Sequence, residues 1–321
     1  MIKVRQVLLC SAVPFFFLAA SCVRENSSRK QDIHVQQMSG FPNQEFGYEL
    51  GVSACYAGII GNKLVMAGGC NFAGKSAAEG GPKYFYKGIY TAEITKDSVL
   101  VWKQVGELPS PVAYGVSISR SGEMILIGGN NADGGLTSVF RLKLAEDGGA
   151  ILDTLPALPF AQDNMSGAAS GNTIYVAGGN RNGSPSTSVL SLNLNEPELG
   201  WKEEVPFPGA ARVQPVCAVQ DGMLYLWGGF CPSQNGGEAS VATDGYRYLP
   251  LQEQWEPVPA PAVAETGEPL TLTGGTSCVW SDSIILCTGG VDKDIFLDAI
   301  SGDYKRCLLY TSDAADDTPC V

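Results

Sequence analysis

Short hydrophobic runs that end in a Gly-Gly pair recur along this chain of 321 residues. The five pairs lie at residues 68–69, 128–129, 178–179, 228–229 and 289–290, so the repeat is 50 to 61 residues long. Glycine at the end of a strand lets two segments approach closely and turn freely. The pattern predicts a series of equivalent β units, each ending in its glycine pair.

One repeat shows the strands that the pattern predicts. Residues 167–170, 173–177, 188–192 and 201–204 have the pattern of four consecutive strands, with the turn dipeptide Gly171-Asn172 between the first two. Four strands in about 50 residues is typical of one blade of a kelch-type β-propeller. We therefore predict an all-β propeller with about five blades present. Tryptophans recur on the predicted fourth strands as packing residues, at positions 102, 201 and 255.

The connections between strands indicate where a binding site lies. In a four-stranded meander, the loop between the second and third strands and the link to the next blade emerge on one face. The longest such loops cover residues 70–88 and 230–243. Because binding residues are usually carried by loops on a rigid scaffold, we expect the site at the channel mouth on this face.

The N-terminus has the features of a bacterial secretory signal, a basic start and a hydrophobic run over residues 7–20. Residues 18–22 are similar to a lipobox, which predicts a signal peptide over 1–21 and a lipid on Cys22. An ordinary signal peptide without lipid is the alternative. Residues 22–45 are polar and predict a flexible tether. We expect a periplasmic or outer-membrane lipoprotein, secreted across the inner membrane.

The C-terminus does not resemble a propeller strand. Residues 307–316 match the translation of a transposase-type sequencing adapter, so we predict that residues 307–321 are an artefact; a natural acidic tail is the alternative. On this interpretation the propeller covers residues 46–306 and is truncated near Arg306. We expect residues 46–50 to supply the closing strand of a missing blade, and the incomplete ring to be poorly stable because its sheet edges are open.

An excess of acidic residues argues against one class of partner. Lys and Arg number 21 against 33 Asp and Glu, a net charge of −12. Nucleic-acid binding needs a basic surface, so we expect no nucleic-acid partner. His34 is the single histidine and lies in the predicted tether, which excludes a Ser-His-Asp triad or a His-ligated metal in the propeller. We expect neither a cofactor nor a metal.

Cysteines of the predicted propeller allow two interpretations. None has the CxxC spacing of a metal site. An oxidising compartment permits disulfides, and Cys55 with Cys70 is the pair to test. Their places in or beside hydrophobic strands favour free thiols that pack as small hydrophobic groups. The six cysteines are at positions 55, 70, 217, 231, 278 and 287.

The ordered motifs of the blades resemble those of one family, the N-acetylneuraminate epimerases or sialate mutarotases, which are six-bladed kelch propellers of the bacterial periplasm. The blade order is similar to that of the cyclically permuted branch, and the resemblance covers about residues 45–306. The motifs that carry it lie at residues 51–58, 67–72, 79–83, 113–117, 127–129, 212–214, 227–229 and 288–296.

The resemblance implies an isomerase that exchanges the α and β anomers of N-acetylneuraminate by ring opening, without a cofactor. A base takes the proton of the anomeric hydroxyl while an acid protonates the ring oxygen. The family's proposed base is a glutamate in a Gly-Glu-x-Lys-Pro-Gly-x-Arg stretch, which this sequence lacks. We expect the catalytic Glu and Arg to lie in the missing blade and this polypeptide to be inactive. The alternative is a non-catalytic kelch lipoprotein that binds a glycan or a protein.

Candidate substrate-binding residues map to the loop-rich face. An arginine suits the sugar's carboxylate, because its planar fork binds a carboxylate through two hydrogen bonds. The alternatives are that Arg212 is a solvated loop cation, that Glu79 and Lys83 form a surface ion pair, and that Tyr114 packs in the core. The predicted set is Arg212, Gln214, Asn71, Glu79, Lys83 and Tyr114.

Overall fold

The computed structural model describes residues 38–95, 99–233, 237–291 and 293–300. The chain divides into two compact units, 1–37 and 38–321, and only the second contains described residues. The predicted signal peptide, Cys22, His34 and the tail at 307–321 lie outside them. Within the described residues, no helix has both the length and the hydrophobicity that a membrane span needs.

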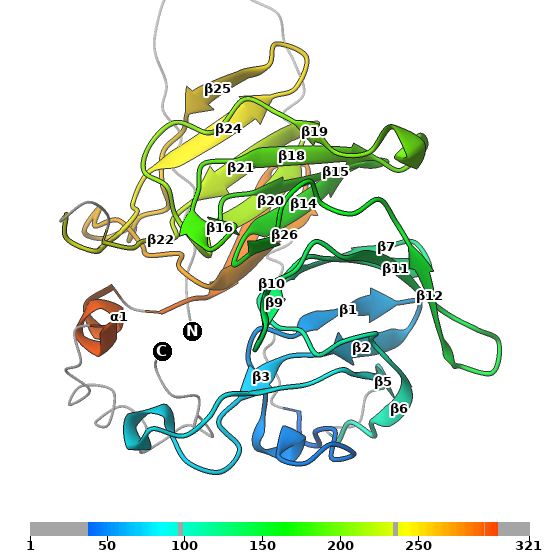
Figure 1. Cartoon of the computed structure of the whole chain (residues 1–321). Coiled ribbons are helices and arrows are strands. Elements are labelled where there is room, and N and C mark those ends of the chain that lie inside the picture. The colour runs from blue at the N-terminus through cyan, green and yellow to red at the C-terminus, as the bar shows by residue number, and fades with distance from the viewer. Residues whose placement is uncertain (1–37, 96–98, 234–236, 292, 301–321) are drawn as a thin grey trace, which may run out of the picture. The chain divides into compact units, whose positions relative to one another are not determined.

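Almost all regular structure in this unit is β-strand, and 16 of the strands form four antiparallel sheets of four (Figure 1). Each sheet is a meander in which consecutive long strands pair, as expected for propeller blades. The sheets are β1 (Tyr56–Ile60), β2 (Lys63–Ala67), β5 (Gly88–Glu93), β6 (Lys103–Glu107); β7 (Val116–Arg120), β8 (Glu123–Ile127), β11 (Val139–Leu144), β12 (Ala150–Thr154); β14 (Ser166–Ser170), β15 (Thr173–Ala177), β18 (Val189–Asn193), β19 (Lys202–Glu203); and β20 (Val216–Gln220), β21 (Met223–Trp227), β24 (Gly245–Leu249), β25 (Gln254–Pro257).

A two-stranded sheet follows the fourth blade, where β26 (Gly275–Ser281) pairs with β27 (Ile284–Gly289). The helix α1 (Lys293–Ile300) comes next, in place of a third strand. The fifth blade is therefore a half-blade in the described part of the chain. The short elements are η1 (Tyr48–Leu50), η2 (Ala77–Glu79), η3 (Pro197–Leu199), β3 (Cys70–Asn71), β4 (Tyr84–Phe85), β9 (Asn130–Asn131), β10 (Gly134–Gly135), β13 (Gln162–Asp163), β16 (Asn180–Arg181), β17 (Ser184–Pro185), β22 (Phe230–Cys231) and β23 (Ser240–Val241).

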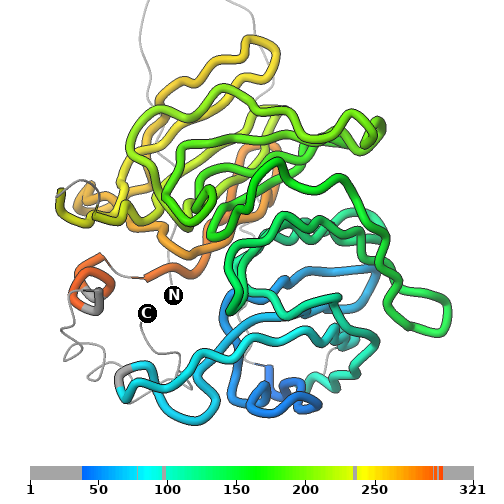
Figure 2. The backbone as a smooth tube through the Cα atoms, in the orientation of Figure 1, coloured from blue at the N-terminus to red at the C-terminus, as the bar shows by residue number. Residues whose placement is uncertain are grey.

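The sheets lie beside one another in the order of the chain (Figure 2). The first strand of each sheet contacts the first strand of the next: β1 with β7, β7 with β14, β14 with β20, and β20 with β26. Serine hydroxyls bind the backbone across these contacts. Ser117 Oγ accepts from Ala57 N (3.1 Å) and donates to Ala57 O (2.8 Å), and Ser277 Oγ donates to Cys217 O (2.6 Å). These hydrogen bonds fix the stagger between neighbouring blades.

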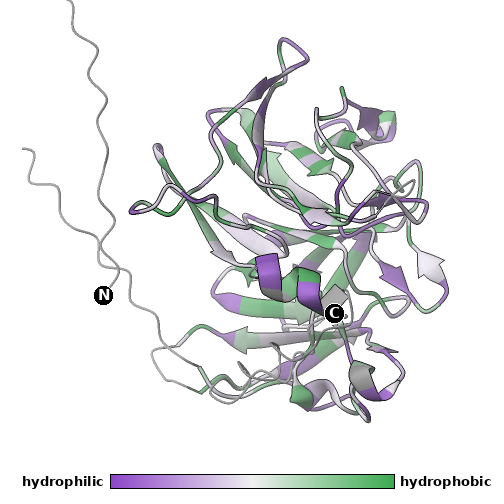
Figure 3. Ribbon diagram, turned by 90° about the vertical axis from the view of Figure 1, so that its left-hand side faces the viewer, coloured by the Kyte–Doolittle hydropathy of each residue, from purple (hydrophilic) through white to green (hydrophobic). Residues whose placement is uncertain are grey.

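Hydrophobic side chains fill the space between adjacent sheets. Val116 and Ile118 of the second sheet, for example, pack with Ile174 and Val176 of the third. Equivalent clusters lie between the first and second sheets and between the third and fourth. Figure 3 shows hydrophobic residues along the strands and hydrophilic ones in the turns. Burial of these faces is the main source of stability, since it removes hydrophobic surface from water.

The Gly-Gly pairs connect each blade to the next. A Cβ on Gly68, the first glycine of its pair, would lie 2.4 Å from Val112 O, and its φ is +65°. Both facts require glycine. In the first three pairs, the second glycine donates its N–H to a backbone carbonyl of the next blade's link. Three such bonds are Gly69 N to Val112 O (2.7 Å), Gly129 N to Gln162 O (2.8 Å) and Gly179 N to Arg212 O (2.8 Å).

The recurring tryptophans also connect blades. Trp201 Nε1 donates to Pro156 O (2.8 Å) and Trp255 Nε1 to Val205 O (2.8 Å). Each carbonyl comes just after the fourth strand of the preceding blade. For the first blade, Trp102 Nε1 donates instead to Gly40 O (3.1 Å). The segment around residue 40 therefore packs on the first blade in the way that the chain just after a preceding blade's fourth strand packs on the later blades.

The structure corrects two predictions for residues 39–50. The predicted tether extends to residue 45, but Leu100 N donates to Ser39 O (2.7 Å) and Tyr90 Oη donates to Glu45 Oε2 (2.6 Å), so residues 39–45 pack on the first blade. The closing strand predicted at residues 46–50 is also wrong. Residues 48–50 form η1, because Tyr48 turns into the core and donates its hydroxyl to Gly68 O (2.9 Å).

All six propeller cysteines lie among the described residues, and none of them forms a disulfide. Cys70, Cys217 and Cys231 are buried, which agrees with thiols that pack as small hydrophobic groups. Burial raises the pKa of Cys55 to about 11 and that of Cys217 to about 12. These thiols therefore stay protonated and unreactive at neutral pH.

Glu204 links the third and fourth blades and gives the fold a dependence on pH. Burial alone would raise its pKa, but hydrogen bonds from Ser191, Lys202 and Tyr248 outweigh burial and hold the pKa of Glu204 below its ordinary value. The ionised form thus stabilises the fold above the unfolded pKa of about 4.3. This contribution is lost as pH falls through the lower, folded-state pKa.

We expect the free energy of unfolding in urea to decrease between about pH 5 and pH 3, and Glu204→Gln to remove part of that slope. The matched control is Glu203→Gln, which removes an exposed neighbouring carboxylate and should leave the slope unchanged. A slope in Glu204→Gln equal to that of the unmodified chain would contradict this assignment.

Candidate functional site

Five residues with left-handed backbone conformation, one before the first strand of each blade, form a continuous chain of hydrogen bonds. We call this set the belt: Ala54 (φ 54°), Tyr114 (φ 60°), Asn164 (φ 53°), Gln214 (φ 51°) and Gly274 (φ 71°). Each backbone N–H donates to the carbonyl of the belt residue one blade earlier. The four distances are 2.9 Å from Tyr114 to Ala54, 2.8 Å from Asn164 to Tyr114, 2.6 Å from Gln214 to Asn164 and 3.1 Å from Gly274 to Gln214.

The belt lies at the end of the sheets from which the loops between second and third strands emerge. In the first four blades, the residue before the belt position pairs with the residue after the Gly-Gly pair of the same blade. The pairs are Ser53 with Cys70, Ala113 with Asn130, Asp163 with Asn180, and Val213 with Phe230. Positive φ at non-glycine residues is strained and tends to cluster at functional sites. One side chain from each of the first four blades is thus gathered at the loop-rich end, whereas the fifth blade contributes Gly274.

Two of the predicted site residues, Lys83 and Tyr114, contact each other at the belt. Lys83 Nζ donates to Tyr114 Oη (2.8 Å) and lies 5.5 Å from the centre of the Phe72 ring. In residues 38–300 apart from the gaps given above, no carboxylate forms an ion pair with Lys83. Burial raises the pKa of Tyr114, so its phenol stays neutral. The pair therefore presents a cation and a hydroxyl side by side.

Gln214 belongs to a second polar group at the belt. Its Nε2 donates to Asn164 Oδ1 (3.0 Å), and Asn164 Nδ2 donates to Asp163 Oδ1 (2.6 Å). Asn180 Nδ2 donates to the same oxygen of Asp163 (2.8 Å), whose side chain is buried. The belt backbone joins this group to Tyr114 through Asn164.

Arg212 is buried, in contrast to the solvated cation that was the alternative interpretation. Only 1% of its side chain is exposed. Its Nη1 and Nη2 donate to the two carboxylate oxygens of Asp244, and Nε donates to Ala210 O (2.9 Å). Burial would raise the pKa of Asp244, but the hydrogen bonds from Arg212 and Tyr246 hold it below its ordinary value. In this structure Arg212 is a structural group joined to the loop before β24, and a role in substrate binding stays a prediction.

Asn71 and Glu79 use their side chains locally. Asn71 Nδ2 donates to Gly47 O and Gly51 O (both 2.7 Å), and its Oδ1 accepts from Tyr86 Oη (2.7 Å). Glu79 closes the first turn of η2 by accepting from Ser76. No ion pair joins Glu79 to Lys83 among the described residues. Both residues therefore shape the loop that carries Lys83, and their contact with substrate stays a prediction.

Asp163, Asn164 and Asn180 were missed by sequence analysis. Asn164 lies 50 residues from both Tyr114 and Gln214, so the repeat itself was a signal that could have found it. Asp163 carried no such signal, because the equivalent residues of the other blades are Ser53, Ala113, Val213 and Thr273. The described residues contain no cluster of three or more His, Cys, Asp or Glu that could hold a metal ion.

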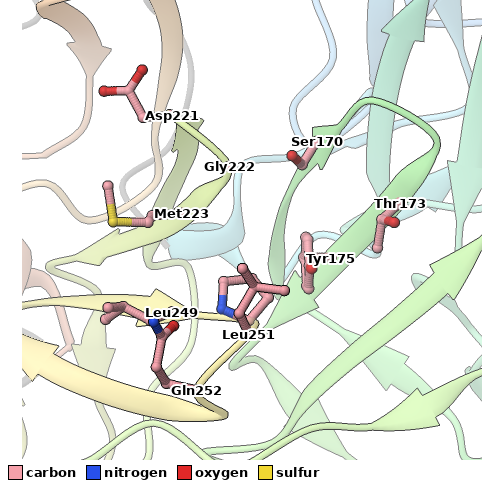
Figure 4. Close-up of a pocket in the computed structure, with 10 residues that line it drawn as sticks. Ser170, Thr173, Tyr175, Asp221, Gly222, Met223, Leu249, Leu251 and Gln252 are labelled. Atoms are coloured by element: carbon pink, nitrogen blue, oxygen red, sulfur yellow. The ribbon is translucent and has the colours of Figure 1, made fainter.

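One hollow lies at the opposite end of the sheets. It has a volume of about 420 Å³ and is lined by the turns β14–β15, β20–β21 and β24–β25 of the third and fourth blades (Figure 4). Ser170, Tyr175 and Asp221 border it, and the nearby Leu251 is exposed. None of the predicted site residues lines it. The belt end, not this hollow, holds the convergent polar groups.

Comparison with known proteins identifies the family. The family model described as N-acetylneuraminate epimerase matches residues 18–151 and 155–307. The chain belongs to the N-acetylneuraminate epimerase family. Among curated relatives, the N-acetylneuraminate epimerase of Haemophilus influenzae (strain PittEE) is 35% identical over 143 residues, 44% of this chain and 35% of that protein. That of Salmonella enteritidis PT4 (strain P125109) is 32% identical over 163 residues, 49% of this chain and 40% of that protein.

The matches to these epimerases span well under half of their length, 35% and 40% in the two cases. A solved structure titled "Structure of YjhT" superposes with a TM-score of 0.59 and covers 75% of this chain and 78% of that chain, at 13% identity. At this identity the likeness concerns the fold alone. It confirms the kelch-type β-propeller that the glycine repeat predicts.

Proposed function

We propose that this chain binds N-acetylneuraminate at the belt end and belongs to an isomerase that interconverts the α and β anomers of this sugar. Membership of the epimerase family supports the substrate class. The chain has 33 acidic against 21 basic residues, so its net charge repels an anion. An anionic ligand therefore needs a defined local cation. Lys83 is placed to be that cation.

The observation that carries the proposal is the arrangement of Lys83 beside Tyr114. The ammonium is held by the phenol oxygen at 2.8 Å and by the Phe72 ring. No carboxylate of the described residues neutralises it. A carboxylate ligand can therefore accept a charge-assisted hydrogen bond from Lys83, which is stronger than a neutral one. The neutral Tyr114 hydroxyl can donate to the same ligand.

Anomer exchange requires a proton acceptor at the anomeric hydroxyl and a donor at the ring oxygen. We place the proton acceptor on the Glu of the Gly-Glu-x-Lys-Pro-Gly-x-Arg stretch and a hydrogen-bonding role on its Arg; residues 1–321 do not contain this stretch. On this proposal the polypeptide binds the sugar but does not accelerate its exchange.

Two NMR measurements on the purified chain test the proposal. Saturation-transfer spectra should show bound N-acetylneuraminate, and exchange spectra of its anomers should give the rate found in buffer alone. Absence of saturation transfer at millimolar sugar would contradict binding. A faster exchange would place catalytic groups within this polypeptide and overturn their assignment to the absent stretch.

We also propose that Cys22 carries a lipid that anchors the protein in the bacterial envelope, with the sugar supplied from the periplasm. The lipobox-like residues 18–22 support this. Metabolic labelling with a radioactive fatty acid in a bacterial host should mark the chain, and Cys22→Ala should abolish the label. Equal labelling of both forms, or none of either, would contradict the anchor.

A further inference from the structure

We propose that Asp163 and Asn164 are positioning residues that fix the orientation of the Gln214 amide, so that Gln214 presents its carbonyl oxygen to the sugar. We call Asp163, Asn164 and Gln214 the relay. The inference rests on the proposed function for the identity of the ligand, but the direction of the relay can be measured without any ligand.

The direction of the relay begins at Asp163. An ionised carboxylate can only accept hydrogen bonds. Asp163 Oδ1 lies 2.6 Å from the Asn164 amide and 2.8 Å from the Asn180 amide, so both amides must turn their NH₂ groups toward it. Because Asp163 is buried, water does not compete for these bonds.

The constraint passes from Asn164 to Gln214. With its NH₂ held by Asp163, Asn164 offers Oδ1 on its other side. Gln214 Nε2 donates to that oxygen at 3.0 Å. An amide that donates from its nitrogen here must point its oxygen elsewhere, so Gln214 Oε1 is left as an acceptor. The orientation of both amides is therefore set by the chemistry of a single carboxylate.

The space around Gln214 Oε1 is open to a ligand. The next belt position is Gly274, and a Cβ built there would lie 3.3 Å from Gln214 Oε1. The absence of a side chain at Gly274 leaves this oxygen uncovered from that side. Among the described residues no group donates to it. The acceptor is thus both fixed in direction and free of a protein partner.

The ligand chemistry follows from two positions of the belt, Tyr114 and Gln214. Lys83 and Tyr114 suit a carboxylate, whereas Gln214 Oε1 suits a hydroxyl or an amide N–H. Tyr114 and Gln214 are two belt positions apart, with Asn164 between them. A sugar acid carries all of these groups on one ring. The relay therefore selects a ligand that has a hydrogen-bond donor on the side opposite its carboxylate.

The test removes the carboxylate at position 163, introduces one at position 214, and combines the two changes. Asp163→Asn removes the constraint, and we expect the affinity for N-acetylneuraminate, measured by calorimetry, to fall about 3- to 10-fold, the loss of one oriented hydrogen bond. Gln214→Glu alone places a second carboxylate that competes for the Asn164 amide and should also weaken binding. In the double variant Asn164 can turn, donating to the new carboxylate at 214 and accepting from the new amide at 163. We expect affinity to recover toward that of the unmodified chain.

The control is Asp147→Asn, which removes one charge from the exposed β11–β12 turn and should leave affinity unchanged. A double variant no tighter than either single variant would overturn the relay, since a merely structural role gives additive losses. Thermal unfolding of each variant shows that the comparison is made on folded protein.

A second measurement uses no sugar. The side-chain NH₂ resonances of Gln214 should shift in Asp163→Asn, although Gln214 does not touch Asp163, and stay unchanged in Asp147→Asn. Unshifted Gln214 resonances in folded Asp163→Asn would overturn the relay whatever the ligand. Shifted resonances in a chain that binds no N-acetylneuraminate would leave the relay standing and reject the proposed function.

Discussion

Replacing Arg212 with methionine is expected to lower the free energy of unfolding by about 3 kcal/mol, the lower end of the range for breaking a buried ion pair. The guanidinium is buried and donates to both oxygens of Asp244, so its removal leaves a carboxylate without its partner. The lower end applies because the Asp244 side chain is 39% exposed and water can solvate it in part. Urea unfolding monitored by tryptophan fluorescence measures the loss.

Arg247→Met is the matched control for this prediction. It makes the same substitution in the same blade, at the pair Arg247–Glu256, whose side chains are 37% and 38% exposed. We expect a clearly smaller loss there, because water screens an exposed ion pair. Equal losses at positions 212 and 247 would contradict the structural role of Arg212. Weaker sugar binding by a stably folded Arg212→Met chain would instead support its predicted part in the site.

Replacing Lys83 with methionine is expected to weaken binding of N-acetylneuraminate by about 10- to 100-fold, because a hydrogen bond to a charged group contributes about 1.5–3 kcal/mol. Methionine keeps an unbranched hydrophobic side chain and removes the ammonium that lies over the Phe72 ring. The free energy of unfolding should change little, since Lys83 makes no ion pair with the described residues. Calorimetric titration of the sugar measures the effect.

Lys75→Met provides the comparison, since Lys75 lies in the same loop between β3 and β4 and is exposed. It should reduce affinity less than about twofold, because an exposed charge that does not contact the ligand acts only through screened electrostatics. Equal effects of the two substitutions would mean that the loop's total charge, and not the position of Lys83, attracts the sugar. That result would contradict the site.

The repeat made most of the fold predictable. All ten glycines of the five pairs have a positive φ, and at Gly68 and Gly128 a backbone carbonyl of the next blade's link also approaches too closely for a Cβ. These local requirements explain why the Gly-Gly pair recurs. The central strands of the blades are continuous hydrophobic runs for a similarly local reason, since both of their faces are buried, as in β8 and β15. Element type and order therefore followed from short stretches of sequence.

The ends of the propeller were less predictable. Residues 46–50 have the composition of a strand, but η1 forms because Tyr48 finds a buried hydrogen bond to Gly68 O, 20 residues away. Gly40 likewise packs on the first blade because its carbonyl accepts a hydrogen bond from the Trp102 indole N–H. Neither contact is visible in the local sequence, since each depends on what the first blade presents.

The candidate site was also predictable only in part. By itself the sequence determined that the chain is a series of kelch blades with a loop-rich end, and it selected Lys83, Tyr114 and Gln214 among the residues that the belt gathers there. Only the tertiary structure decided which polar groups remain available. Arg212 is occupied because Asp244, 32 residues later, returns to meet it, while Lys83 meets no carboxylate of the described residues. Whether a charged side chain is free to bind a ligand depends on partners that come from distant parts of the sequence, and no local pattern of residues encodes these partners.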